Sequence, residues 1–466
     1  MFRMLVNGEL ISSSQALDVV NPATGKPFAQ AARADLDLLN HAVAAARDAF
    51  PAWSALSFEE RGEYLRKLAA AIEEKKEDFA RTLTQEQGKP YKQAFGETLG
   101  AIGTLKGWFV MSTPSKTLRE NEKERVIEHY TPLGVVAAIT PWNFPLVIAT
   151  SKIGPALIAG NTVVLKPAPT TPLTTLMIGE LAADILPKGV LNIIADENEL
   201  GGALSSHPDV AKVSFTGSTA TGKKVMHSAA DSLKRLTLEL GGNDAAILLD
   251  DVDVDAIAPK LFGAATLNAG QVCLAVKRVY APREKYDQVC DALAKLANEA
   301  VVDSGDNQGA QIGPVQNAMQ FEKLKGFLED ARQNGKIIAG GEAMDRDGYF
   351  IRPTIVRDVP DDARIVREEQ FGPILPVLAY DDLDDVIARA NDSEYGLGGS
   401  VWSSDIDRAQ EIAMKIDSGT VWVNKHIDLP FDVPFGGAKQ SGIGREKGQV
   451  GLEEFTQPKI VNISLA

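Results

Sequence analysis

Hydrophobic spacing predicts amphipathic helices through the first hundred residues of the chain. Ser57 and Glu60 form a capping-box pattern at the start of one such helix, and Gly88 followed by Pro90 ends it. Lysine and glutamate fill the positions between the hydrophobic ones, as on the outer face of a helix that covers a domain. The apolar face of this helix comprises Leu65, Leu68, Ile72 and Phe79.

From residue 134 onward, short β-rich runs alternate with helical stretches. Such alternation is typical of βαβ units, which form a parallel sheet with helices on both faces. Dinucleotides bind at the carboxyl ends of the strands of such sheets. The predicted strands are Gly134–Thr140, Asn161–Lys166, Leu191–Ala195 and Lys212–Thr216, with helices at Leu146–Ala159 and Pro172–Leu186.

A second series of the same kind begins near Ala245, after a relaxed Gly241-Gly242 pair that predicts a domain boundary. Two charged, β-like segments, Val126–Tyr130 and Lys459–Leu465, predict an edge ribbon used in assembly. The strands expected in the second series are Ala245–Leu249, Arg278–Ala281, Pro373–Ala379, Ser400–Ser403 and Thr420–Asn424, with helices at Leu383–Asn391 and Asp405–Ile416.

Composition restricts the class of protein. A chain of 466 residues is long enough for two or three domains, and its net charge of −15 provides no general basic surface for nucleic acid. The apolar runs are too short to span a bilayer. Two cysteines form no disulfide framework, and with five histidines they show no metal-ligand spacing. We expect a cytoplasmic protein with no membrane span, no nucleic-acid partner and no metal site.

A glycine-rich turn, Gly217–Lys224, follows a predicted strand and should open a helix. It nearly matches the P-loop pattern, but Lys224 stands where a Mg²⁺-binding hydroxyl is needed, which argues against a nucleotide triphosphatase. The turn could still bind a pyrophosphate, because a helix N-terminus offers free N–H groups and the positive end of a dipole. Taken alone, an ordinary strand-to-helix turn explains it slightly better.

Two residues are candidates for covalent chemistry. Cys273 follows a small, flexible segment, and its thiol would need a nearby base or positive dipole to form thiolate. Glu239 lies between leucines and precedes two glycines, and a carboxylate in apolar surroundings can act as a general base. Cys290 occupies an apolar position of a predicted helix and is expected to be inert. Taken alone, Cys273 is better explained as a buried, inert cysteine, and Glu239 is equally compatible with a surface position on a strand.

Six motifs occur in one order over nearly the whole chain: Pro141–Pro145, Phe215–Ser218, Leu238–Gly242, Gly270–Cys273, Glu368–Pro373 and Pro434–Gly437. Together they resemble the aldehyde dehydrogenase superfamily. The resemblance implies an α/β fold with a modified Rossmann cofactor domain (1–113 and 133–241), an α/β catalytic domain (242–438) and a small β-ribbon oligomerisation element (114–132 and 439–466). It also implies a homodimer or homotetramer.

The same resemblance implies oxidation of an aldehyde to a carboxylic acid with NAD or NADP. Cys273 would attack the carbonyl, and the Asn143 amide with the Cys273 backbone N–H would stabilise the oxyanion. Glu239 would activate the water that hydrolyses the resulting thioester, and could also deprotonate the thiol beforehand. Lys152 and Glu446 match family positions proposed for proton relay.

Cofactor contacts also follow from the resemblance. Lys166 resembles the lysine that bonds the adenosine ribose, and Ser218 would face the pyrophosphate. Glu369 and Phe371 resemble the pair that positions the nicotinamide ribose and ring. Many NAD-using members carry a glutamate where this chain has Pro169, so we favour NAD but leave NADP open. The remaining expected cofactor contacts are Thr140, Trp142, Ala168, Gly217, Gly222 and Leu240.

The substrate tunnel is expected to involve Phe144, Ser151, His426 and Phe431. Ser151 stands where family members often carry a bulky aromatic residue, which would widen the tunnel. The loop 425–431 contains no arginine to clamp a substrate carboxylate. This pattern favours an apolar or aromatic aldehyde over a dicarboxylic semialdehyde.

Three other functions remain open alongside hydrolytic aldehyde oxidation. In an acylating relative, coenzyme A would take the acyl group, but such relatives tend to lack the carboxylate found here at Glu239. A nucleotide triphosphatase is disfavoured by Lys224. A non-catalytic protein that kept the fold is disfavoured by the intact set of Cys273, Glu239 and Asn143.

Overall fold

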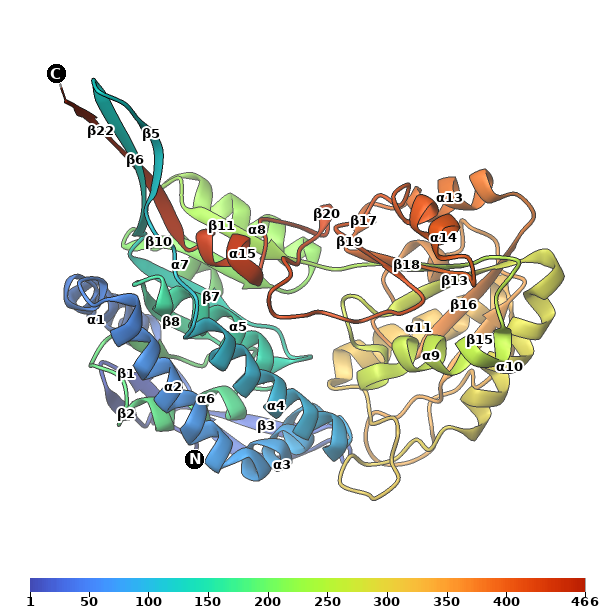
Figure 1. Cartoon of the computed structure of the whole chain (residues 1–466). Helices are drawn as coiled ribbons and strands as arrows, with labels where there is room; N and C mark the ends of the chain where they lie inside the picture. Colours follow the sequence, from blue (N-terminus) through green and yellow to red (C-terminus); the bar gives the residue numbers. More distant parts are fainter. Residues whose placement is uncertain (466) are drawn as a thin grey trace.

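The computed structural model describes residues 1–465, in which two large sheets lie side by side (Figure 1). The strands β9, β8, β7, β10 and β11 of the first sheet are parallel, and β2, β1 and β21 extend it antiparallel at its edges. All four strands predicted for the first series are present. Their order is β2 (Glu9–Ile11), β1 (Met4–Val6), β9 (Leu191–Ile193), β8 (Thr162–Lys166), β7 (Val135–Ile139), β10 (Val210–Thr216), β11 (Arg235–Glu239) and β21 (Gly442–Ile443).

Helices cover both faces of this sheet, and residues of β7 and β8 are buried throughout, as expected for central parallel strands. The capping box at Ser57 and Glu60 is present, and Gly88 ends the last turn in a left-handed conformation with φ of 96°. The helices are α1 (Leu36–Ser54), α2 (Phe58–Glu74), α3 (Lys76–Gln87), α4 (Tyr91–Trp108), α5 (Pro145–Ile158), α6 (Leu173–Ala182), α7 (Gly201–Ser206) and α8 (Thr219–Ala230).

The helical expectation for the first hundred residues is wrong at the N-terminus. Besides β1 and β2, a hairpin of β3 (Ala16–Asn21) and β4 (Lys26–Ala32) precedes α1. Leu17 and Val19 are buried while Asp18 between them is exposed, which is the two-residue period of a strand. The predicted single helix also divides at Lys75, between α2 and α3.

The second sheet contains the five strands expected there and two more. All neighbours in it are parallel except β14 and β15. Its order is β14 (Lys336–Ala339), β15 (Thr354–Arg357), β16 (Ile374–Tyr380), β13 (Val276–Pro282), β12 (Asp244–Leu248), β18 (Gly398–Trp402) and β19 (Thr420–Val423). The helices of this half are α9 (Val254–Thr266), α10 (Tyr286–Glu299), α11 (Ala318–Asn334), α12 (Arg364–Arg367), α13 (Leu383–Asn391) and α14 (Ile406–Ala413).

The chain passes between the two halves more than once. Residues 240–243 link β11 of the first sheet to β12 of the second. After β19 the chain returns, and β21 pairs with β11 at Glu239 before α15 (Gly448–Glu453). The carboxyl ends of the first sheet therefore lie beside segments contributed by the second half.

A three-stranded antiparallel ribbon projects from the first half (Figure 1). It consists of β5 (Lys116–Glu120), β6 (Glu124–Pro132) and β22 (Thr456–Ser464), and β22 pairs with β6 along its full length. The two segments predicted to form an edge ribbon are thus neighbours in space.

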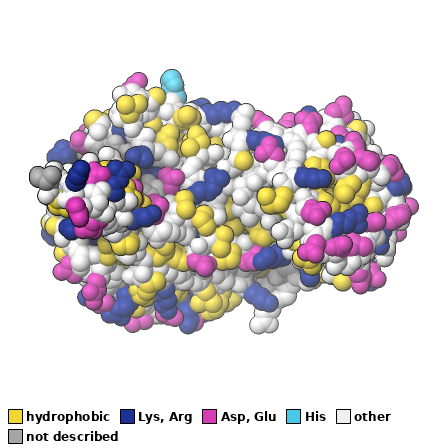
Figure 2. Space-filling view, turned by 45° about the horizontal axis from the view of Figure 1, so that its top comes forward, with side chains coloured by type: hydrophobic (Ala, Val, Ile, Leu, Met, Phe, Trp, Pro, Cys, Tyr) yellow, Lys and Arg dark blue, Asp and Glu magenta, His cyan; other side chains and the backbone are white. Residues whose placement is uncertain are grey.

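On the face shown in Figure 2, basic and acidic side chains are mixed, with Asp and Glu frequent over the second half. Among the described residues 1–465, the helices are too short or too polar to cross a membrane.

Candidate functional site

Four candidate residues lie at the carboxyl ends of neighbouring parallel strands. Thr140 follows β7, Lys166 ends β8, Thr216 ends β10 and Glu239 ends β11. The strands are in register, so Thr216 lies opposite Glu239. The hydroxyls of Thr140 and Thr216 are buried and have no hydrogen-bond partner within the described residues. Because buried hydroxyls are normally bonded, this edge has unused capacity for a polar ligand.

The glycine-rich turn leads directly from β10 into α8, as predicted. The Ser218 hydroxyl caps the helix by accepting the Thr221 N–H. A Cβ atom at Gly222 would lie 2.5 Å from the Leu240 side chain, so only glycine allows this helix to approach so closely. The N-terminal N–H groups of α8 and its positive dipole end are suited to an anion.

Lys166 is held at this edge by a carboxylate. Its ammonium group pairs with Asp196, and both side chains are almost fully buried. Asp196 also accepts the Leu200 N–H at 2.7 Å. Ala168 is buried and Pro169 half-buried just after β8. Hydrophobic periodicity did not indicate a role for Asp196, which follows β9. The parallel register of β8 and β9 brings Asp196 close to Lys166.

Cys273 follows a turn with unusual backbone geometry. Asn268, Ala269 and Gly270 have φ values of 51°, 55° and 73°, in the left-handed region that non-glycine residues rarely adopt. A Cβ atom at Gly270 would lie 2.3 Å from the Gly372 carbonyl oxygen. Backbone in this region costs on the order of 1–3 kcal/mol per residue and persists only where surrounding contacts fix it.

Asn143 helps to hold the left-handed turn before Cys273 in place. Its side-chain amide donates to the Gln271 carbonyl at 3.0 Å, and its own carbonyl accepts the Asn268 side-chain amide at 2.9 Å. The ammonium group of Lys89 donates to the same carbonyl at 2.9 Å. The segment that carries Asn143 is thereby bonded directly to the turn that carries Cys273.

Lys89 belongs to a buried ion pair that the sequence analysis missed. Its partner is Glu97, and both side chains are essentially inaccessible to solvent. Glu97 accepts the backbone N–H groups of Leu146 and Val147 at the start of α5. The only local hint is a lysine in the Gly88–Pro90 turn, because nothing in hydrophobic periodicity indicates a contact between two polar residues.

We expect Lys89→Met to lower the free energy of unfolding by about 3–5 kcal/mol, because it leaves the Glu97 carboxylate buried without its cation. Denaturant titration measures the change. Lys92→Met, on the exposed face of α4, the helix that carries Glu97, is the matched control and should stay within about 0.5 kcal/mol. Equal unfolding midpoints for the two variants would show that the pair does not stabilise the site.

Cys273 is half-buried, whereas Cys290 is completely buried in the core of the second half. The Cys273 side chain is therefore partly accessible, whereas Cys290 belongs to a core, as expected. The apolar residues around Cys273 are Phe144, Leu267, Val272, Leu274, Ala275, Leu397, Trp422, Ile427, Leu429 and Phe435.

Burial and three nearby carboxylates oppose the ionisation of Cys273, and one nearby lysine favours it. Burial raises the pKa of the thiol to about 12, the positive charge of Lys277 lowers it, and Glu369, Glu239 and Asp244 raise it further. With a thiol pKa of about 12, the thiolate fraction at neutral pH is very small. The thiol therefore needs a base, and Glu239 is the carboxylate of the first sheet whose charge acts on it.

Glu239 lies in surroundings suited to a general base. Its side chain is buried, and neither carboxylate oxygen has a hydrogen-bond partner within the described chain. Burial raises the pKa of Glu239 well above its usual range, Glu446 raises it further, and Lys152 and Arg445 lower it. Lys152 pairs with Glu446 at 2.7 Å and donates to the Ser214 hydroxyl at 3.0 Å. The two expected relay residues are thus bonded to each other beside Glu239.

Glu369 reaches the same place from the second half. Its carboxylate accepts the Gly242 N–H at 3.0 Å and pairs with Lys277 at 3.1 Å. Phe371, with φ of 54°, packs edge-to-face on Trp142 with ring centres 5.3 Å apart. The expected nicotinamide pair is therefore close to the turn of Cys273.

The Gly241-Gly242 pair has a steric role. A Cβ atom at Gly241 would lie 2.5 Å from a carboxylate oxygen of Glu369, and one at Gly242 would lie 2.6 Å from the Cys273 carbonyl. Glycine is required because the carboxylate and the nucleophile turn both approach this backbone closely.

The expected substrate residues occupy different environments. Phe144 borders the Cys273 cluster and lies beneath the Lys89 ammonium group, 3.9 Å from its ring centre. Ser151 is buried on α5. Phe431 packs on Trp108 of α4 with ring centres 4.7 Å apart, so part of its surface covers the first core.

The His426 side chain is turned inward. It lies 2.9 Å from the Leu274 carbonyl, and its ring is 4.7 Å from that of Trp422. Burial lowers the pKa of His426 to about 3, so the ring is neutral even though Asp244 lies 3.7 Å away. In this geometry His426 braces the backbone next to Cys273.

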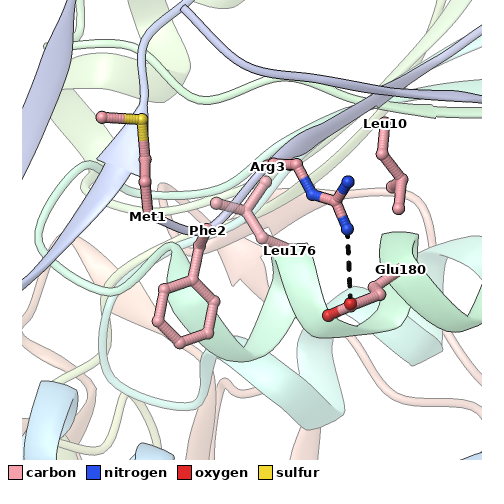
Figure 3. Close-up of a pocket in the computed structure, with 6 residues that line it drawn as sticks. All are labelled: Met1, Phe2, Arg3, Leu10, Leu176 and Glu180. Atoms are coloured by element: carbon pink, nitrogen blue, oxygen red, sulfur yellow. Dashed lines mark ion pairs between the residues drawn. The ribbon is translucent and has the colours of Figure 1, made fainter.

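A separate surface hollow lies beside β1 and α6 (Figure 3). A half-exposed ion pair between Arg3 and Glu180, 3.6 Å long, crosses it. None of its lining residues belongs to the Cys273 cluster. They are Met1, Phe2, Arg3, Leu10, Leu176 and Glu180.

Comparison with known proteins gives one consistent result. A sequence model of the aldehyde dehydrogenase family matches residues 10–461. An aldehyde dehydrogenase of a Fusarium species is 39% identical over 463 residues, which span 99% of this chain and 98% of that protein. The NADP(+) succinate-semialdehyde dehydrogenase GabD of Escherichia coli is 38% identical over 470 residues, spanning 99% and 97%. The NAD+ complex of an aldehyde dehydrogenase from Bacillus cereus superposes with a TM-score of 0.97 at 37% identity, covering 100% of this chain and 97% of that one.

Proposed function

Because the chain belongs to the aldehyde dehydrogenase family, we propose that it oxidises apolar or aromatic aldehydes to carboxylic acids with Cys273 as the nucleophile. NAD(P)-dependent aldehyde oxidation is the activity of the family, and the whole-chain match confirms the expected α/β fold. The observation that carries the proposal is the close approach of the Cys273 turn and the Glu369 carboxylate to the Gly241-Gly242 backbone, which directly follows Glu239.

The residues at the carboxyl edge of the first sheet fit a dinucleotide. The unpartnered hydroxyls of Thr140 and Thr216, the N-terminus of α8 and Lys166 line one edge. Lys166 would bind the adenosine ribose, α8 the pyrophosphate and Glu369 the nicotinamide ribose. When bound, the dinucleotide accepts the hydride that leaves the former aldehyde carbon. We propose NAD+ as the preferred form of the cofactor. NADP+ is proposed as the second form, because Pro169 places no carboxylate against its 2′-phosphate.

Acylation begins with proton transfer from the Cys273 thiol to the Glu239 carboxylate. The thiolate then attacks the aldehyde carbon and forms a C–S bond, and the carbonyl electron pair moves to oxygen. The amide of Asn143, now bonded to Gln271, and the backbone N–H of Cys273 would stabilise this oxyanion. Loss of the hydride re-forms the carbonyl, which leaves an acyl group on the sulfur.

Deacylation needs a second base-assisted step. Once Glu239 has released the proton that it gained in acylation, its carboxylate removes a proton from water, the water oxygen attacks the thioester carbon, and the thiolate leaves as the carboxylic acid forms. The raised pKa of Glu239 makes it a stronger base than an exposed carboxylate once it is ionised. The neighbouring Lys152–Glu446 pair is suited to accept the proton from Glu239 and pass it on.

The preference for apolar aldehydes rests on the side chains around Cys273. The cluster contributed by Phe144, Ile427, Leu429 and Phe435 is aliphatic or aromatic. In the nearby loop, the charge of Lys425 is directed to Asp428, and His426 is neutral. The carboxylate of a semialdehyde substrate would therefore lose its hydrating water without gaining a cation, which is costly.

We expect kcat/KM for benzaldehyde and hexanal to exceed that for succinic semialdehyde by at least about tenfold, which corresponds to about 1.4 kcal/mol of transition-state binding. Initial rates of reduced-dinucleotide formation with each aldehyde, and with each of NAD+ and NADP+, provide the measurement. A reversed ratio would assign the chain to dicarboxylic semialdehydes instead.

The ribbon of β5, β6 and β22 would join subunits in a homodimer or homotetramer. It carries exposed Leu118, Ile460 and Ile463 beyond the body of the protein. Apolar side chains on a projecting sheet are typical of a surface that is covered by a partner.

A further inference from the structure

The side chain of Lys277 is a buried cation that the reaction scheme above does not use. It lies on β13, four residues after Cys273, and is almost inaccessible to solvent. Its ammonium group donates to the Cys273 carbonyl and pairs with Glu369 at 3.1 Å. A buried lysine without partners would be strongly unfavourable, so these contacts determine its position.

One partner of Lys277 belongs to the nucleophile, and the other belongs to the proposed cofactor site. The Cys273 carbonyl is part of the turn that presents the nucleophile, and Glu369 is the carboxylate proposed to bind the nicotinamide ribose. Gly242 joins them as well, because its N–H donates to Glu369 at 3.0 Å while its Cα faces the Cys273 carbonyl. A shift of either partner therefore moves the common cation.

No neighbouring cation among the described residues makes the same two contacts as Lys277. Arg278, the next residue, is directed away and donates to the Asn243 carbonyl. Lys323 reaches only the backbone carbonyl of Glu369, from the exposed side. Asp244, Glu239 and Glu369 oppose ionisation of the thiol, and Lys277 is the positive group that favours it.

We propose that Lys277 is a positioning residue that holds the Cys273 turn and the Glu369 carboxylate together, so that ionisation of the nucleophile and binding of the dinucleotide depend on one side chain. The inference rests on the proposed function, in which Glu369 contacts the nicotinamide ribose. It extends that function by giving the cofactor carboxylate and the nucleophile a common partner.

Two variants test the proposal in the full-length enzyme. Lys277→Met removes both the charge and the donor, whereas Lys277→Gln keeps a donor for the Cys273 carbonyl and removes only the charge. Lys323→Met is the matched control, because it removes the exposed lysine on the other side of Glu369. Thermal unfolding checks that each variant is folded.

The first readout is the rate of Cys273 alkylation by iodoacetamide between about pH 6 and 10, without aldehyde. The second is the dissociation constant of NAD+ from quenching of protein fluorescence. We expect both Lys277 variants to alkylate at least about tenfold more slowly at each pH, as a thiol pKa higher by about one unit requires. We expect NAD+ binding to weaken at least about fivefold, about 1 kcal/mol. Lys323→Met should match the parent protein in both.

The proposal is overturned if folded Lys277→Gln keeps the parent alkylation profile, or if only one of the two readouts changes. It is also overturned if neither variant folds, because Lys277 would then be a packing residue. Neither readout uses an aldehyde. Failure of the proposed oxidation, seen as turnover by Cys273→Ala, is therefore distinguishable from failure of this inference.

Discussion

Cys273→Ala is expected to reduce aldehyde oxidation by about 10⁴-fold or more, because no other group in the cluster can form the acyl intermediate. The substitution removes one sulfur atom from a half-buried position, so the free energy of unfolding should change by about 1 kcal/mol or less. Dinucleotide binding should persist, since Lys166, the start of α8 and Glu369 are untouched. Steady-state rates and fluorescence quenching by NAD+ measure the two effects separately.

Cys290→Ala is the matched control for this experiment. Cys290 lies on α10 in the core of the second half, and burial raises the pKa of its thiol to about 12. We expect the control to lose some stability through the small cavity it creates, while kcat/KM stays within about twofold of the parent value. Loss of turnover in Cys290→Ala with retention in Cys273→Ala would reverse the assignment of the nucleophile.

Glu239→Gln is expected to separate the two halves of the reaction. The amide has nearly the same shape but cannot accept a proton. The thioester then forms only from thiolate produced by solvent, and its hydrolysis, which has lost its general base, is slower still. Stopped-flow absorbance should show a burst of about one reduced dinucleotide per active site, followed by a steady-state rate lower by about a hundredfold or more. A lower rate without a burst at any pH would show that Glu239 acts only before acylation.

The pH dependence of that burst reports on the thiol itself. Without Glu239 as proton acceptor, acylation depends on thiolate formed directly by solvent, and the thiol pKa is raised to about 12 by burial. The burst rate of Glu239→Gln should therefore rise about tenfold per pH unit across the neutral range. In the parent protein the rise should level off once Glu239 is ionised. A flat profile in the variant would indicate a thiol pKa far below this value.

Much of this site follows from where parallel strands end. The alternation of short apolar runs with helices predicted β7, β8, β9 and β10, and Lys166 is the final residue of β8. It did not predict β11, the strand that ends at Glu239. The six ordered motifs then placed Cys273 and Glu369 beside them, although no local pattern links these positions. The first 32 residues were assigned incorrectly, because strands of three to seven residues offer too few positions for a two-residue period to be distinguished from a helix.

The contacts that the sequence did not reveal are ion pairs between buried polar residues. Lys89 with Glu97, Lys166 with Asp196 and Lys277 with Glu369 are pairs whose members lie far apart in the chain or on different elements. Periodicity reports which side chains face a core and carries no information about which charges meet there. The left-handed turn at Asn268 and Ala269 is equally hidden, since tertiary contacts hold it against local preference.

The acyl-enzyme is the species on which the whole account depends, and its mass can be measured. Glu239→Gln mixed with benzaldehyde and NAD+ should gain the mass of one benzoyl group per chain, and peptide mapping should place that group on the sulfur of Cys273. Parent enzyme quenched at the same moment should carry much less of it. Reduced dinucleotide formed by the variant with no adduct, or with the adduct on any other residue, would contradict covalent catalysis by Cys273.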